Sequence, residues 1–200
     1  VLRYLQFDSD TDAMAARPDP NSPLSQLNKI SVVGARITID DPIIGAFWGA
    51  RHADIQITRA PGGVHIEYDL DTDFRGQSPT LRGTVDYRPA DGDILVATQF
   101  EKLRPDVLGT EDDVLAPLKA LGVTLGGSIN FRMSMDGKFR NATYKIRSGE
   151  GVVRLPHPHL EKVKVKSISA AGNVDAELNR LVVKQLTVDL GGPMIELSGS

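Results

Sequence analysis

Apolar and polar residues alternate along most of the chain, and this alternation predicts a protein built from β-strands. The stretch "GVHIEYDLDTD", residues 63–73, is the clearest example. Successive side chains of a strand point to opposite faces of a sheet, so this pattern predicts one apolar face and one face in water. Two sets of side chains alternate here: Val64, Ile66, Tyr68 and Leu70 on the apolar face, and His65, Glu67, Asp69 and Asp71 on the polar face.

The same period of two recurs in many further segments, which Gly, Pro and Asp turns separate. On residues 31–40 it places Val33, Ala35, Ile37 and Ile39 on one face. The turn "APGG" joins residues 53–58 to residues 63–73 as an antiparallel hairpin. Further strands are predicted at residues 1–7, 80–88, 94–100, 123–135, 139–147, 151–155, 161–169, 172–178, 180–190 and 194–199. This spacing of strands and turns is typical of an all-β chain.

One segment, residues 103–122, has helical spacing instead. Four apolar residues recur there at helical intervals: Val114, Leu115, Leu118 and Leu121. Thr110 is the predicted N-cap and Gly122 the predicted stop, while Pro117 predicts a kink or a restart. The acidic run "GTEDDV" suits the start of a helix better than a cation site, because carboxylates offset the helix dipole.

Composition narrows the class of protein. The 200 residues are 40% hydrophobic and 24% charged, which is typical of a globular chain, and the net charge of -3 gives no reason to expect nucleic acid. There is no Cys, which excludes thiol chemistry and fits either the cytoplasm or a periplasm. The chain begins at Val1 and ends at "IELSGS", so we expect a piece of a longer protein. Its targeting and anchoring signals are then expected to lie outside this piece.

The apolar faces of these strands need a cover. The predicted helix is too short to cover so much sheet. The apolar faces can be covered in two other ways: the sheet closes on itself as a sandwich or barrel, or it stays open as an apolar trough that lipid fills. We predict a mainly β fold with a curled or groove-like antiparallel sheet and one short helical segment. The alternative is a closed β-sandwich that serves as a scaffold or binding module.

Several motifs occur in an order that resembles a known family. They are "ISVVGARITIDDPIIGAFWGARHADIQITRAPGGVHIEYDLD", which includes Trp48, then "LRGTVDYRPADGDILVATQFEKLRPDVL", "LGVTLGGSINFRMSMDGKFRNATYKIRSGEGVVRLP" and "GNVDAELNRLVVKQLTVDLGGPMIELSGS". In this order they resemble the central domain of the AsmA-like proteins of Gram-negative envelopes, in the branch related to YhdP. The resemblance covers residues 24–200, while residues 1–23 fall outside it and are predicted to be an N-terminal strand and linker.

The resemblance implies a periplasmic protein that an N-terminal helix, outside this piece, anchors to the inner membrane. It further implies a β-groove that bridges inner and outer membranes and carries phospholipid. An outer-membrane partner is compatible with this expectation. In this reading the partners are phospholipid acyl chains, and no cofactor is needed. For the alternative closed β-sandwich, the same resemblance implies a scaffold or binding module in envelope or outer-membrane protein assembly. The residues then expected to face lipid are Val64, Ile66, Tyr68, Leu70, Leu81, Val85, Ile129, Phe131 and Met133.

Other candidate sites have simpler readings. His157 and His159 have a spacing seen in zinc sites, but the flanking prolines favour a solvated turn. Carboxylates at Asp40, Asp41, Asp69, Asp71 and Asp73 are better read as a solvated sheet face than as catalytic or calcium-binding groups. Alternating lysines at Lys162, Lys164 and Lys166 favour protection of a sheet edge over contact with lipid phosphates. The chain lacks the G-x-S-x-G, P-loop and H-E-x-x-H motifs, so we do not expect an enzyme.

Overall fold

The computed structural model describes residues 27–41, 46–60, 62–74, 76–107, 116–154, 161–175 and 180–199. Ten of its strands form one antiparallel sheet: β1 (Lys29–Asp41), β2 (Ala46–Ala60), β3 (Gly63–Asp73), β4 (Thr80–Arg88), β5 (Asp93–Leu103), β7 (Leu125–Ser134), β8 (Phe139–Ser148), β11 (Ser167–Val174), β12 (Leu181–Asp189) and β13 (Met194–Ser198). Three short strands form a second sheet: β6 (Leu121–Gly122), β9 (Gly151–Val153) and β10 (Val163–Val165). Two 3-10 helices are described as well: η2 (Pro105–Val107) and η3 (Ala116–Ala120).

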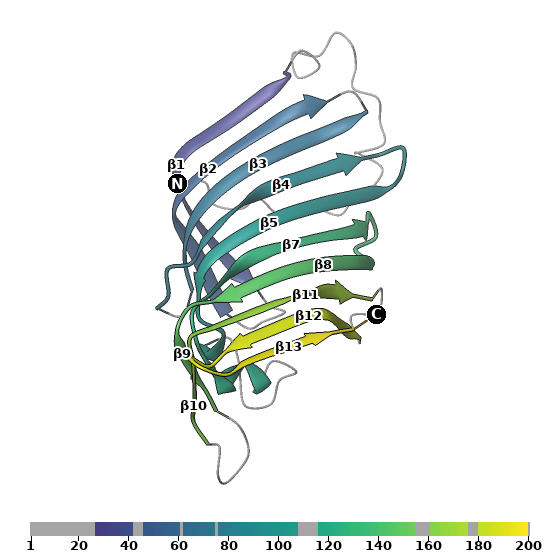
Figure 1. The fold of residues 1–200 in the computed structure, drawn as a ribbon. Coiled ribbons are helices and arrows are strands. Elements are labelled where there is room, and N and C mark those ends of the chain that lie inside the picture. The colour runs from purple at the N-terminus through teal and green to yellow at the C-terminus, as the bar shows by residue number, and fades with distance from the viewer. Residues whose placement is uncertain are drawn as a thin grey trace.

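The large sheet is open. Its strand order runs β1-β2-β3-β4-β5-β7-β8-β11-β12-β13, so β1 and β13 are its two edges and do not pair with each other. Each strand pairs antiparallel with its neighbour, and several neighbours are joined by a short turn, such as residues 89–92 between β4 and β5. Figure 1 shows the long strands as curved ribbons that bend toward one end of the sheet. The predicted mainly β, antiparallel and open fold class is confirmed.

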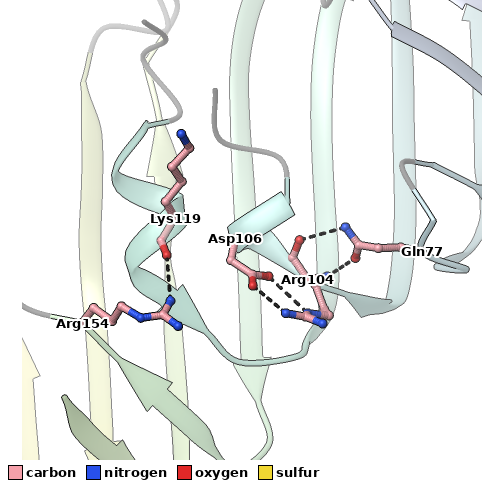
Figure 2. Close-up of polar contacts among 5 residues, drawn as sticks. All are labelled: Gln77, Arg104, Asp106, Lys119 and Arg154. Carbon is pink, nitrogen blue, oxygen red and sulfur yellow. Dashed lines mark hydrogen bonds and ion pairs between the residues drawn. The ribbon is translucent and has the colours of Figure 1, made fainter. Parts of the chain in front are cut away.

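The second sheet and the 3-10 helices belong to the connections at one end of the large sheet. The chain passes from β5 through η2, η3 and β6 to β7, and from β8 through β9 and β10 to β11. The Gln77 side chain ties the first connection to the β3–β4 loop, because its amide bonds both the backbone N–H of Arg104 (2.7 Å) and the backbone carbonyl of Arg104 (3.2 Å). Figure 2 shows these contacts together with the Arg104–Asp106 ion pair and the bond from Arg154 to the Lys119 carbonyl.

A β-bulge corrects the predicted face of β1. Val32 pairs with Ile55 and Ala35 pairs with Ala53, so two residues of β1 oppose the single residue Asp54 of β2. The extra residue shifts the alternation by one position, as bulges do. Val32 therefore lies in line with Ala35 on the apolar face, and Val33, which the alternation placed there, is 79% exposed.

Two further predictions are wrong. Residues 161–169 do not form one strand, because the strand is interrupted at Lys166, which lies between β10 and β11. The predicted helical segment appears as 3-10 turns where the structure describes it, and Gly122 belongs to strand β6 instead of ending a helix. Residues 108–115, which include the predicted N-cap Thr110, and residues 1–26 lie outside the described part of the chain.

The buried core of the described residues is small. The hydrophobic residues that it buries are Ala50, Ala53, Phe100, Val123, Ala142, Tyr144 and Val165. Pro105 of η2 is the large residue that is fully enclosed. Most other apolar side chains of the sheet are half-buried, as expected where neighbours within one sheet shield each other and no second layer of described residues covers them.

Candidate functional site

The strand register assembles the predicted apolar residues into one continuous face. Ile66 pairs with Val85, and Val85 pairs with Val96, which pairs with Phe131. Directly opposite residues of antiparallel strands point to the same face, so each of these rows is a row of neighbouring side chains. All nine residues predicted to face lipid lie on this face and all are half-buried: Val64, Ile66, Tyr68, Leu70, Leu81, Val85, Ile129, Phe131 and Met133.

The apolar face extends over strands that the prediction did not assign to it. In the row of Ile66 the register adds Ile30, Ile57, Val96, Ala142, Val174 and Leu181. In the row of Leu70 it adds Ala35, Ala53, Phe100, Gly127, Ile146, Ala170, Leu186 and Leu197. No residue in these two rows is charged, and toward β13 the face is open to solvent, with Leu197 59% exposed. The site is thus a sheet face ten strands wide, or about 40 Å at ~4.8 Å per strand.

Between these two rows runs a third, which we call the midline row. Its members pair in sequence across the sheet: Val32, Ile55, Tyr68, Gly83, Thr98, Ile129, Tyr144, Gly172 and Val183. The midline row combines small residues with two tyrosines, whereas the residues in the rows of Ile66 and Leu70 are apolar. The prediction included Tyr68 and Ile129 but missed Thr98 and Tyr144, whose place follows from the register between strands and not from the pattern within one.

Each midline tyrosine lies across a glycine. The Tyr68 hydroxyl reaches Thr98 Oγ1 on β5 (2.6 Å), and a Cβ added to Gly83 on the intervening strand would sit 2.7 Å from that hydroxyl. The Tyr144 hydroxyl likewise donates to the carbonyl of Val182 on β12 (3.2 Å) across Gly172. Both rings therefore extend along the apolar face instead of standing up from it.

The opposite face of the sheet is polar and ion-paired. Arg82 bonds Asp69 (2.8 Å), and His65 lies between Asp86 (2.7 Å) and Glu67 (3.5 Å). His65 donates a hydrogen bond to the Asp86 carboxylate, which favours the charged imidazolium and raises the pKa of His65. These contacts fit the predicted solvated sheet face for Asp69, and Asp71 and Asp73 are exposed there as well.

The polar face also has a basic depression of about 530 Å³ between β4 and β8. Four cationic residues line it: Arg82, Lys102, Lys145 and Arg147. All four are exposed, Arg82 is held by Asp69, and Arg147 lies 4.0 Å from Glu101. Lys102 has a left-handed backbone (φ 60°) at the β5 bulge. Without a buried polar group to fix a ligand, this depression is a weaker candidate than the apolar face.

The remaining candidates give no second site. His157, His159 and the side chains of Asp40 and Asp41 lie outside the described residues. Among the residues that the structure describes, no three His, Asp or Glu side chains lie close enough together to hold a metal ion. Lys164 lies on β10, an edge strand of the small sheet, in agreement with the predicted edge protection. Within the same described ranges, no helix has the length and apolar character needed to cross a membrane.

Comparison with known proteins identifies no relative. No family model matches the chain, and no curated protein or solved structure is significantly similar to it. The resemblance to AsmA-like proteins therefore stays a prediction that rests on sequence motifs, and function has to be argued from the apolar face.

Proposed function

We propose that this chain is a segment of a periplasmic, bridge-like lipid transfer protein whose apolar sheet face carries phospholipid between the inner and outer membranes. One observation carries the proposal: the apolar face is continuous across an open sheet, and most of its residues, including all nine predicted to face lipid, are half-buried instead of fully buried. An uncovered apolar surface of this width exceeds the patches that monomers usually expose. It needs an apolar occupant, and acyl chains are one that fits.

The driving force is burial of hydrocarbon. Each CH2 group that leaves water contributes about 0.8 kcal/mol. The rows of Ile66 and Leu70 offer similar aliphatic surface from strand to strand, so an acyl chain that moves across the sheet exchanges one apolar contact for another. Such a surface holds lipid without one deep well, and no chemical step or cofactor is involved.

The polar face supports the same proposal. Its ion pairs and exposed charged side chains keep that side of the sheet in water, which leaves a single face for lipid. The sequence resemblance supplies the setting, which is a periplasmic protein anchored in the inner membrane by a segment outside this piece. An outer-membrane partner belongs to the same proposal.

The competing hypothesis is a scaffold module with the same residues as its dry core. This hypothesis predicts a closed β-sandwich, whereas the large sheet is open and β1 and β13 each have one neighbouring strand among the described residues. A protein partner that covers the apolar face would be the surviving form of this hypothesis. The experiment below separates it from lipid transfer.

The test is site-specific photo-crosslinking in cells, in the full-length protein. A photo-reactive residue replaces Ile66 on the apolar face and, in a second variant, its neighbour Glu67, which is exposed on the polar face. Lipid adducts at position 66 and none at position 67 are expected. Protein adducts alone at position 66 would overturn the lipid proposal in favour of the scaffold.

A further inference from the structure

Among the described residues, the midline row and its two flanking rows contain two polar side-chain contacts, both in the midline row, and these contacts differ in their hydroxyl hydrogens. The Tyr144 hydroxyl has a single hydrogen, which it donates to the Val182 carbonyl. Tyr68 and Thr98 bring two hydroxyl hydrogens but share one bond of 2.6 Å. One hydroxyl hydrogen therefore has no acceptor among the described residues.

The surroundings of this second hydrogen are apolar. Tyr68 and Thr98 are half-buried, and the residues beside them in the flanking rows are Ile66 and Leu70 on β3 and Val96 and Phe100 on β5. A hydroxyl donor in such surroundings is costly to leave without a partner once water is displaced. A ligand that lies along the midline row removes that water and must offer an acceptor to compensate.

The absence of charge defines which acceptor fits. None of the residues in the midline row or in its two flanking rows is charged, so a carboxylate would be desolvated there without a counter-ion. An ester carbonyl accepts a hydrogen bond, carries no charge and adjoins an acyl chain. It thus matches both the donor and the apolar rows on either side of it.

We propose that the Tyr68–Thr98 hydroxyl pair is a hydrogen-bond site for the ester carbonyl of an acyl chain bound along the midline row. The site rests on the proposed function and extends it, because it makes the face selective for acyl esters over plain hydrocarbon. Gly83 is part of the arrangement, since only a residue without a side chain lets the Tyr68 ring cross β4 to Thr98.

The test is competitive displacement of an apolar fluorescent probe, N-phenylnaphthylamine, from the purified full-length protein. The competitors are methyl palmitate, which has an ester, and heptadecane, which has similar length and none. One net hydrogen bond corresponds to a roughly five-fold preference for the ester. We expect this preference in the natural protein and its loss in the double variant Tyr68→Phe/Thr98→Val, because either single variant keeps one hydroxyl hydrogen.

The matched control is Thr84→Val, which removes a hydroxyl from the polar face of β4 and is expected to keep the ester preference. Binding of the probe by the double variant shows that it folds, and each single variant, which keeps one hydroxyl hydrogen, is expected to keep the preference. Equal displacement by both competitors in the natural protein, or a preference that survives in the double variant, would overturn the ester site and leave the proposed function standing. Failure of both competitors to displace the probe from the natural protein, or of the probe to bind it, would overturn both.

Discussion

Gly83 determines how the middle of the apolar face is built. A Cβ at this position would clash with the backbone oxygen of Ala97 and sit 2.7 Å from the Tyr68 hydroxyl. We therefore expect Gly83→Ala to lower the free energy of unfolding by about 1–3 kcal/mol, as overpacking does. Gly126→Ala is the matched control, because its nearest backbone atom would lie at 3.4 Å, an ordinary contact. Urea denaturation of the two variants makes the comparison, and equal losses would contradict the account.

His65 makes the stability of the sheet depend on pH. Its hydrogen bond to Asp86 raises the pKa of the folded imidazole above the usual 6.5. A group whose folded pKa is raised stabilises fully below its unfolded pKa, and this contribution disappears as pH rises through the folded pKa. We expect the free energy of unfolding to fall over that window, above pH ~6.5, and His65→Gln to remove the fall.

His52→Gln serves as the control for His65. It also removes an imidazole near a carboxylate, Asp54 at 3.3 Å, but leaves the His65–Asp86 contact intact. The pH dependence assigned to His65 should persist in this variant. A His65→Gln protein with the same slope as the natural one would show that the Asp86 contact does not couple to folding.

At the scale of elements, the β1 bulge depends on one hydrogen bond. Gly34 has φ 63° and its N–H donates to Asp54 Oδ1 at 2.8 Å, which lowers the pKa of Asp54. We expect Asp54→Ala to speed hydrogen exchange of the Gly34 amide and of its neighbours in β1, because the bulge loses its acceptor. Asp71→Ala, on the exposed face of β3, should leave β1 exchange unchanged. Mass spectrometry of peptides that cover residues 29–38 reads both variants.

The Asp54 contact also predicts a pH effect of opposite sign to that of His65. A lowered folded pKa means that the contact stabilises above the unfolded pKa of the carboxyl and is lost as pH falls through the folded one. Protection of the β1 amides, measured relative to the intrinsic exchange rate at each pH, should therefore fall at acidic pH in the natural protein. Asp54→Ala should show low protection at both ends of the range.

The sequence predicted the strands well because a half-buried sheet imposes a period of two on each of them. Residues 63–73 match β3 in full, and residues 80–88 match β4. It failed where the geometry departs from that period: the bulge that puts Val32 in place of Val33, and the break at Lys166. The alternation within one strand contains no information on whether that strand has an extra, bulged residue relative to the adjacent strand.

The site was predictable in part for the same reason. Period two identifies which residues of a strand share a face, so the nine apolar residues came out together. Which residues become neighbours across strands is set by register, and hairpin turns fix register in ways that composition does not reveal. The Tyr68–Gly83–Thr98 alignment is of this second kind, and only the structure brought it together.

At the scale of the whole molecule, an open face and a closed core respond differently to charge. Ile66 is half-buried, so Ile66→Asp keeps its carboxylate in water and is expected to cost about 1–2 kcal/mol. Val165, in β10 of the small sheet, is 5% exposed, and Val165→Asp should cost about 4 kcal/mol or more. Chemical denaturation of both variants tests this. An Ile66→Asp loss as large as that of Val165→Asp would mean that the apolar face is covered.

The last prediction follows from the width of the apolar face. If acyl chains lie along the midline row, residues far apart in sequence but in that row must respond to lipid together. Ile55, Ile129 and Val183 sample the row from β2 to β12. Because the chain has no Cys, a single cysteine at each position accepts a nitroxide label without background.

We expect phospholipid loading to slow the nitroxide and to shield it from a water-soluble relaxation agent at all three positions. Gln56→Cys and Asn130→Cys, which follow Ile55 and Ile129 on the polar face, should show no change. A response at Ile129 alone would indicate a local pocket instead of a path across the sheet. Equal responses on both faces would mean that lipid binds the sheet without regard to its apolar side, and transport along a one-sided groove would have to be abandoned.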